Sequence, residues 1–475
     1  MSRSWFIALT ALFIFPLLFP GQTPFVNDEA MLMQKALRHN AEGSLADSGL
    51  TGTQGRKYGP LPVWIDQAIL LITHDPIAIM SIRIALVTAL LLCGLLSLQQ
   101  TLQLWKWGLP AIAMSPYVWY FARQLWDNSF NLPLSVVCLA AYVSFLARPR
   151  AAALFLVLVL GGAMLLVHWM AAPLVGAALI HLAITRPREL KRFWQPAAFA
   201  TLIVLFAGIR YWPQVTQFDG AFVARSNQPN SAWFALLGPR NLSGAWIEYI
   251  FPRDWLSASS AWRVLFEIAR ALSLIAFPLT WFGMILGAIA VARVAKLRGQ
   301  STSLRPRTIT DDAAIVCTLA IAGQIVLNII THTHGHPHYY NGTFAAYAML
   351  MWIALDRLLK RWPRARFLGW TQLAGVSALC VLLLVRVIQT RGTRDLHFGS
   401  TLNSQIEVVR DLTKYSELSP VRFDVVIMPR SLQVLEALRP HPRDGTEPTR
   451  DLVIRYRASK DDTAGAIELA EDARD

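Results

Sequence analysis

Residues 4–20 read SWFIALTALFIFPLLFP, and the stretch FVNDEAMLMQKALRHN follows at 25–40. The first stretch is a nearly unbroken apolar run, close to the length that crosses a bilayer as a helix. The second is polar and carries two adjacent carboxylates, Asp28 and Glu29, just after the apolar run ends. We expect an uncleaved membrane helix rather than a signal peptide, because no small-x-small cleavage site follows the run.

Apolar runs of this kind recur along the whole chain. Of its 475 residues, 54% are hydrophobic and 16% are charged, whereas soluble proteins have about 25% charged residues. A further apolar piece at 61–73 contains Asp66 and Gln67, which predicts an interfacial or re-entrant helix rather than a span. The sequence therefore predicts an all-α polytopic membrane protein with about eleven transmembrane helices. The expected spans are 4–20, 77–99, 107–122, 129–147, 151–167, 169–185, 195–212, 268–293, 312–331, 340–358 and 367–388.

The net charge of +14 does not indicate a nucleic-acid partner. Many of the basic residues lie in short clusters between apolar runs, as the positive-inside rule describes. If Arg3 is inside and every run spans once, all these clusters fall inside and the C-terminus falls outside. This sidedness predicts a cytoplasmic N-terminus and a C-terminus on the outer side. The expected location is the bacterial inner (plasma) membrane, with the active site on the periplasmic side. The clusters are Arg148 and Arg150; Arg186, Arg188, Lys191 and Arg192; Arg293, Lys296, Arg298, Arg305 and Arg307; and Arg357, Lys360, Arg361, Arg364 and Arg366.

The chain divides into a membrane domain at 1–388 and a small soluble domain at 389–475. The membrane domain has a first outer loop at 21–76 and a large, aromatic outer loop at 213–267. The tail alternates helical and strand-like patterns, which predicts a small C-terminal α/β appendage on the outer side. Its expected elements are helices at 401–416 and 431–438 and strands at 422–429 and 451–457, followed by a polar end.

Asp28 is the first candidate for chemistry. A partly desolvated carboxylate at the membrane edge is suited to act as a general base on an approaching hydroxyl. The alternative is a structural role, in which Asn27 or Asp28 caps a helix at 29–39 and the acids are favoured by the helix dipole. The two interpretations are compatible, because a cap also fixes a base in place. Glu29 is expected to support or cap.

Several cations are expected on the same face as Asp28. Arg56 and Lys57 oppose the positive-inside trend, so they bind either a lipid phosphate or, as ordinary anchors, lipid headgroups. Arg83 stands alone within an apolar run, which marks it as functional or as a residue that snorkels to the surface. Arg123 and Asp127 are spaced i,i+4 and form a loop ion pair, unless Asp127 is a second acid of the site.

Four histidines alternate in THTHGHPHYYNG, at 331–342. Alternate residues of an extended segment point to one side, so His332, His334 and His336 are a candidate metal site. Gly335 and Pro337 break the regularity, and the preferred role for His338 and Tyr339 is hydrogen bonding to a phosphate. The four cysteines all fall in apolar runs, which excludes a disulfide framework and a cysteine metal site. They are Cys93, Cys138, Cys317 and Cys380.

The order of these motifs resembles the GT-C superfamily of integral-membrane glycosyltransferases over residues 1 to about 360. The branch with protein O-mannosyltransferases and aminoarabinose transferases for lipid A is the most similar. In that branch an Asp-Glu pair lies in the first outer loop, as Asp28-Glu29 does here. The family's Lys-Pro-Pro-Leu-like motif is loosely similar to KYGPL at 57–61 of this chain. The family's Arg at the start of the next span is similar to Arg83, and its late His-Tyr-Tyr-like motif is similar to HYY at 338–340. There is no Asp-x-Asp motif on the outer side, which disfavours the metal-dependent oligosaccharyltransferase branch.

The resemblance implies a transfer of a sugar from a polyprenyl-phosphate donor to an acceptor hydroxyl, with inversion and with Asp28 as base. The resemblance implies no cofactor, with a divalent metal as the alternative. The expected partners are the polyprenyl-phosphate-linked sugar donor, an acceptor that is a glycan, a lipid or a protein, and membrane lipids. A transporter or lipid flippase without covalent chemistry is the second hypothesis, and a metal-sensing membrane protein is the third. The residues expected to bind the donor phosphate or substrate are Arg56, Lys57, Tyr58, Arg83, Arg123, Asp127, His338 and Tyr339.

Overall fold

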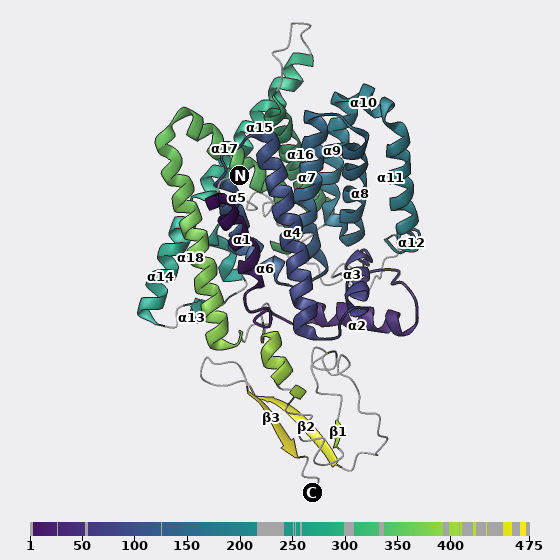
Figure 1. The fold of residues 1–475 in the computed structure, drawn as a ribbon, viewed down its shortest axis with the longest axis vertical. Coiled ribbons are helices and arrows are strands. Elements are labelled where there is room, and N and C mark those ends of the chain that lie inside the picture. The colour runs from purple at the N-terminus through teal and green to yellow at the C-terminus, as the bar shows by residue number, and fades with distance from the viewer. Residues whose placement is uncertain are drawn as a thin grey trace.

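The structure is a computed structural model. It describes residues 3–25, 27–52, 56–124, 126–215, 242–249, 251, 253–256, 259–298, 308–331, 337–392, 399–407, 409–410, 421–423, 434, 450–457 and 466–471. Most of the chain forms a bundle of roughly parallel helices, shown in Figure 1. The labelled α-helices are α1 Arg3–Leu17, α2 Asn27–Ala41, α3 Leu61–Leu70, α4 Pro76–Leu102, α5 Gly108–Ala113, α6 Pro116–Ala122, α7 Asn131–Ala147, α8 Ala151–Val167, α9 Ala172–Thr185, α10 Pro187–Arg192, α11 Trp194–Ala207, α12 Trp212–Val215, α13 Arg253–Leu256, α14 Ser260–Ser273, α15 Ala276–Arg298, α16 Ile309–Ile330, α17 Phe344–Arg361 and α18 Arg366–Thr390.

Short 3-10 helices and a small sheet complete the described structure. The labelled 3-10 helices are η1 Asp127–Phe130, η2 Trp169–Ala171, η6 Gly244–Tyr249, η7 Pro337–Thr343 and η8 Pro363–Ala365, and the strands are β1 Val421–Phe423, β2 Arg450–Arg457 and β3 Ala466–Glu471.

Six helical stretches among the described residues are long and apolar enough to cross a membrane. Four of the shorter apolar helices, α1, α8, α9 and α11, coincide with further predicted spans. Local signals set the helix starts: Asp75 caps α4 by accepting from the amides of Ile77 and Ala78 at 2.8 and 2.9 Å, and Pro76 is the first helical residue. The predicted all-α polytopic class is therefore confirmed. The long stretches are Pro76–Leu102, Asp127–Ala147, Ser260–Val294, Ile309–Ile330, Pro337–Arg361 and Pro363–Thr390.

Two predicted spans differ from the structure. The run 107–122 forms two helices, α5 and α6, rather than one. Ser115 is the N-cap of α6, where its hydroxyl accepts a hydrogen bond from the Val118 amide, and Pro116 has no amide hydrogen with which to continue α5. The run 268–293 is divided between α14 and α15, and α14 begins at Ser260, inside the predicted loop 213–267. The piece at 61–73 forms α3, a helix of only 10 residues, as expected for an element that does not span.

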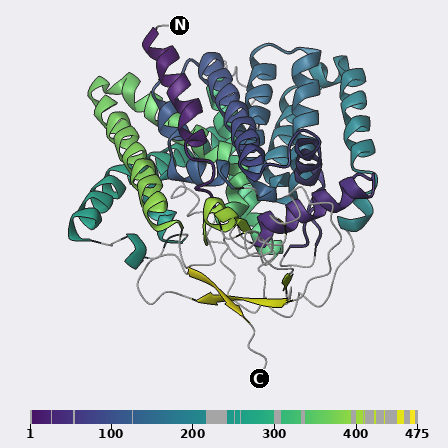
Figure 2. The same cartoon turned by 60° about the horizontal axis from the view of Figure 1, so that its bottom comes forward.

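Helix α2 lies across one end of the bundle, nearly perpendicular to α4 (Figures 1 and 2). We call this the α2 end: α2, α3 and η1 contact one another, and η1 also contacts η7. Ala30, Leu32, Met33 and Ala36 bury the inner face of α2, in one apolar cluster with residues of α3 and α4. The α2 end is therefore a packed layer that closes the bundle.

The chain after α18 joins this layer. Thr401 pairs with Pro24, and the amide of Leu402 donates to the Thr23 carbonyl at 2.9 Å. The Gln405 side chain donates to the Phe25 carbonyl at 2.7 Å. The beginning of the predicted soluble domain is thus attached to the first loop, directly before Asp28.

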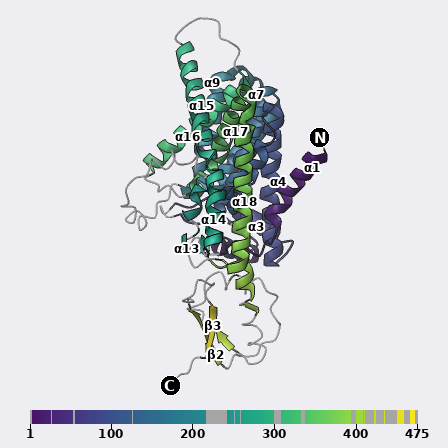
Figure 3. The ribbon, with the colours of Figure 1, turned by 90° about the vertical axis from the view of Figure 1, so that its left-hand side faces the viewer.

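The three strands form a small sheet beyond the α2 end, seen from the side in Figure 3. β1 pairs in parallel with β2, and β2 pairs antiparallel with β3, with Ile454 opposite Leu469. β2 coincides with the predicted strand 451–457, and β1 overlaps the predicted strand 422–429 at residues 422–423. β3 lies in the segment that was expected to be a polar end. The predicted helix at 401–416 is observed at 402–407 and 409–410, and of the one at 431–438 only Val434 belongs to the described residues.

Candidate functional site

Three segments meet around Asp28 at the α2 end. Asp28 lies in the first turn of α2, and its Oδ2 accepts a hydrogen bond from the Trp126 indole at 2.6 Å. The Trp126 ring packs on His338 of η7, with 4.3 Å between the ring centroids. α2 begins at Asn27 rather than at the predicted 29, so Asp28 is a helical residue of the first turn.

Hydrogen bonds hold η1 and η7 together beneath this contact. The Asn128 side chain donates to the His338 carbonyl at 2.5 Å, and the Asn341 side chain donates to the Asn128 carbonyl at 3.2 Å. Tyr117 of α6 donates toward the Pro337 carbonyl and the Asn341 side-chain oxygen, both at 2.7 Å. The position of His338 relative to Asp28 is therefore set by buried polar groups, which fix geometry strongly because leaving any of them unpaired is costly.

Burial dominates the electrostatics of Asp28. It raises the pKa of the carboxyl group above its usual value, and the Trp126 hydrogen bond opposes part of this increase. The position in the first turn of α2 also favours the ionised form. A carboxylate with a raised pKa that is still held by a donor is a stronger base than an exposed aspartate.

Asp127 is the second acid of the site. It is buried, its Oδ1 accepts from the Asn128 amide at 2.6 Å, and its charge and that of Asp28 repel each other. Its Oδ2 is buried and, within the described part of the chain, makes no hydrogen bond. Glu29 is buried beside them at 3% exposure. The carboxyl groups of Asp28 and Asp127 thus repel each other when both are ionised, and a proton bound by either of them would relieve this repulsion.

The predicted ion pair between Arg123 and Asp127 is not formed. Arg123 is buried, and its guanidinium donates to the carbonyls of Pro16 and Leu18 at 2.8 and 2.7 Å and of Phe19 at 2.9 Å. These carbonyls lie at and just beyond the C-terminal end of α1, where helix carbonyls have no intrahelical partner. Arg123 therefore holds the end of α1 instead of facing Asp127.

Arg83 likewise has a structural partner. Its Nη1 donates to both carboxylate oxygens of Asp66, at 2.7 and 2.9 Å, and its Nη2 lies 3.4 Å from the Trp126 carbonyl. Arg83 and Asp66 are 2% and 0% exposed, so the pair is fully buried between α3 and α4. The snorkelling interpretation of Arg83 is wrong, and Asp66 is a residue whose role the sequence did not indicate.

Tyr58 and Lys57 point to different surroundings. Residues 49–52 and 56–59 run side by side, with Thr51 bridged to Lys57 and the Tyr58 amide donating to the Leu50 carbonyl at 2.7 Å. Successive side chains of such an extended segment alternate in direction. Tyr58 packs on His168 with 4.1 Å between ring centroids, and burial, together with Tyr339, Asp127 and Asp28, raises its pKa.

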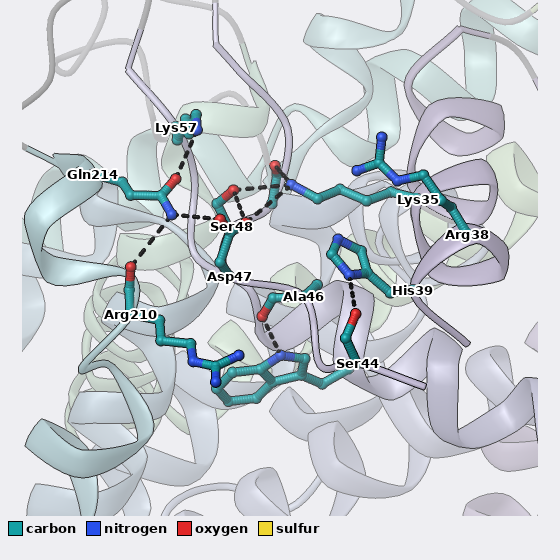
Figure 4. Close-up of polar contacts among 12 residues, drawn as sticks. Lys35, Arg38, His39, Ser44, Ala46, Asp47, Ser48, Lys57, Arg210 and Gln214 are labelled. Atoms are coloured by element: carbon teal, nitrogen blue, oxygen red, sulfur yellow. Dashed lines mark hydrogen bonds and ion pairs between the residues drawn. The ribbon is translucent and has the colours of Figure 1, made fainter. Parts of the chain in front are cut away.

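Lys57 instead donates to Gln214 of α12 at 2.8 Å, and Gln214 donates to Asp47 at 2.6 Å (Figure 4). Arg56 lies over the Trp169 ring at 6.0 Å from its centroid. The structure thus brings Tyr58, Asp127, His338 and Tyr339 toward Asp28, and directs Lys57 into a separate polar network.

The predicted metal ligands His332, His334 and His336 lie outside the described residues. Among the residues that are described, no group of three or more histidine, cysteine, aspartate or glutamate side chains is placed to hold a metal ion. His168, which precedes η2, is buried, and its Nδ1 accepts from the Met170 amide at 3.1 Å.

The fold matches two solved structures. One is ArnT from Cupriavidus metallidurans in the apo state, with a TM-score of 0.56 and 13% identity over 94% of this chain and 85% of that chain. The other is the same protein bound to undecaprenyl phosphate, with a TM-score of 0.55 and 13% identity over 95% of this chain and 86% of that one. The chain has the ArnT fold.

This likeness agrees with the predicted all-helical polytopic architecture at the level of the fold, and the six long apolar stretches among the described residues are those expected of an integral membrane protein. No protein-family model matches the sequence. No curated protein matches it either. At 13% identity the likeness shows the fold and assigns no role to individual residues.

Proposed function

We propose that this chain is a glycosyltransferase that moves a sugar from a polyprenyl-phosphate donor to an acceptor hydroxyl at the outer face of the membrane. One observation carries the proposal: the largely buried Asp28 carboxylate is held at 2.6 Å by Trp126, beside a second acid, at one end of an ArnT-like bundle. The ArnT structure with undecaprenyl phosphate supports the donor class. We propose the bacterial inner membrane as the location, with the N-terminus cytoplasmic and the α2 end periplasmic.

Asp28 is the proposed base. The acceptor hydroxyl gives its proton to the Asp28 carboxylate, and its oxygen attacks the anomeric carbon from the face opposite the phosphate. The bond from that carbon to the phosphate oxygen breaks, its electron pair leaves with the polyprenyl phosphate, and the configuration inverts. A base must lie within hydrogen-bond reach of the hydroxyl, about 2.6–3.2 Å. Trp126 leaves one oxygen of Asp28 for this contact.

The leaving phosphate gains charge and needs donors directed at it. Arg56 on Trp169 and His338 on Trp126 are the proposed groups, together with the Tyr58 and Tyr339 hydroxyls. Arg83 and Arg123 hold the scaffold in this proposal, and Asp127 and Glu29 shape the field around Asp28. We further propose 1–388 as the transferase domain and 389–475 as a soluble domain beside it.

The test begins with cells that lack the protein. Lipid mass spectrometry should show an accumulated polyprenyl-phosphate sugar, which then serves as donor for the purified protein. Asp28→Asn should fold and bind undecaprenyl phosphate but release polyprenyl phosphate from the donor about 10²–10⁴-fold more slowly. Glu42→Gln, an exposed acid just past α2, is the control and should retain the rate. Normal turnover by Asp28→Asn would show that the base is wrong.

A further inference from the structure

A cavity of about 530 Å³ lies against α2 and the loop that follows it, next to the polar network that joins Asp47, Gln214 and Lys57. The helix residues that line it share one stripe with Asp28, because they follow it at helical spacing. This stripe is opposite the face that packs on α3, and Gln34 and Arg38 on it are exposed. The described lining residues are Met31, Gln34, Lys35 and Arg38 of α2 and Gly49, Leu50 and Thr51 of the following loop.

Lys35 fixes the wall of this cavity. Its ammonium donates to the Ser48 hydroxyl at 2.9 Å and to the Gly49 carbonyl at 3.0 Å, and lies 3.8 Å from Asp47, as Figure 4 shows. Burial lowers the pKa of Lys35 to about 8; Asp47 opposes this, and the charges of Lys57 and Arg38 add to it. Lys35 is therefore still mainly protonated at pH 7 and carries its positive charge at the wall of the cavity.

Asp47 and Glu42, the carboxylates paired with Lys35 and Arg38, only partly offset the positive charge of these two side chains. Asp47 also accepts hydrogen bonds from Gln214 and from Ser48, and it is shared between Lys35 and the network that contains Lys57. Arg38 lies 3.8 Å from Glu42, but both side chains are more than half exposed, and such surface pairs are weak. Arg38 can turn into the cavity at little cost, and none of the described lining residues is acidic.

We infer that this cavity binds an anionic group, such as a phosphate, carried by the acceptor; the inference rests on the proposed function. The rise of a helix places Lys35 about 10 Å and Arg38 about 15 Å along α2 from Asp28. An acceptor molecule would span this distance if its hydroxyl lay at Asp28 and its anionic group lay one or two sugar rings away. The cavity lies on the exposed side of α2, whereas the polyprenyl tail of the donor has to remain in the bilayer.

The experiment uses inorganic phosphate as the probe and the full-length protein in detergent, with saturating undecaprenyl phosphate already bound. Isothermal titration should detect phosphate binding at this second site. Arg38→Glu and Gln34→Glu, both at exposed positions, should each weaken phosphate binding about tenfold or more and leave the affinity for undecaprenyl phosphate unchanged. Arg188→Glu, on exposed α10 at the other end of the bundle, is the control and should bind phosphate normally.

Two results would overturn the inference. If inorganic phosphate binds the protein without undecaprenyl phosphate but not the protein saturated with it, the cavity belongs to the donor and not to the acceptor. If phosphate binding is absent, or is as strong in Arg38→Glu as in the unmodified protein, the cavity is not an anion site. Failure of the proposed function is measured separately: it would appear as donor cleavage that does not depend on Asp28, whether or not phosphate binds beside Lys35.

Discussion

Trp126→Phe should raise the pKa of Asp28 further. The substitution removes the indole N–H that donates to the carboxylate at 2.6 Å and keeps an aromatic ring to pack against His338. A hydrogen bond to a charged group contributes about 1.5–3 kcal/mol, and 1.36 kcal/mol corresponds to one pKa unit. Because the bond stabilises the ionised form, its loss should raise the pKa of Asp28 by about one to two units.

The sign of the effect on activity follows from the role of a base. Asp28 has to be ionised to accept a proton, so the rate rises as the pH rises through its pKa. Trp126→Phe should move this acidic limb of kcat/KM to higher pH by the same one to two units and restore much of the rate above it. Stability depends on pH in the opposite direction to the rate, because the pKa of Asp28 is raised in the folded state and its contribution to stability is lost as the pH rises through that folded pKa.

Infrared titration measures the pKa of Asp28 without a substrate. The protonated-carboxyl band that is absent in Asp28→Asn should disappear at higher pH in Trp126→Phe than in the unmodified protein. Trp64→Phe is a matched control, because its indole donates to the Ala46 carbonyl and not to an acid. An unmoved Asp28 band, combined with a rate that falls equally at every pH, would refute the positioning role and leave Trp126 as a packing residue.

Two further predictions concern the scaffold. Arg83→Met should lower the free energy of unfolding in detergent by about 3 kcal/mol, because it leaves the Asp66 carboxylate buried without its partner. Adding Asp66→Leu to this variant should recover much of the loss, whereas additive losses from the two substitutions would contradict the pairing. Arg123→Met should lower the free energy of unfolding by about 2–4 kcal/mol, because several carbonyls at the end of α1 lose their donor. A new limited-proteolysis site should also appear near Phe19. Unchanged stability and unchanged resistance to the protease would show that Arg123 does not hold the end of α1.

The sequence predicted most of the helical frame because hydropathy responds to the property that a spanning helix needs. It was wrong where a polar signal lay inside an apolar run. Ser115-Pro116 is a helix-start pattern, a capping hydroxyl followed by a proline, and it divides 107–122 although every neighbour is apolar. β3 was missed because a six-residue strand that contains two glutamates has little apolar alternation.

The site was predicted less well, because charged residues were assigned from their spacing along the chain. The i,i+4 rule paired Arg123 with Asp127, but it holds only within a helix, and α6 ends at Ala122 before η1 begins at Asp127. Asp66 was read as an interruption of an apolar piece. Only the packing of α3 on α4 shows that it neutralises Arg83.

The charges at the α2 end follow a pattern that sequence alone does not reveal. Arg83 and Arg123 are satisfied by a carboxylate and by carbonyls, and Lys57 by an amide, so the cations nearest to the motifs in sequence are held in the frame. The cations that line the cavity lie on α2 itself, at Lys35 and Arg38, on the stripe that begins with Asp28. A single helix laid across the bundle therefore carries the proposed base at its first turn and cations two to three turns later. An anionic acceptor would be aligned along α2, and the orientation of its hydroxyl would be set by the helix rather than by a flexible loop.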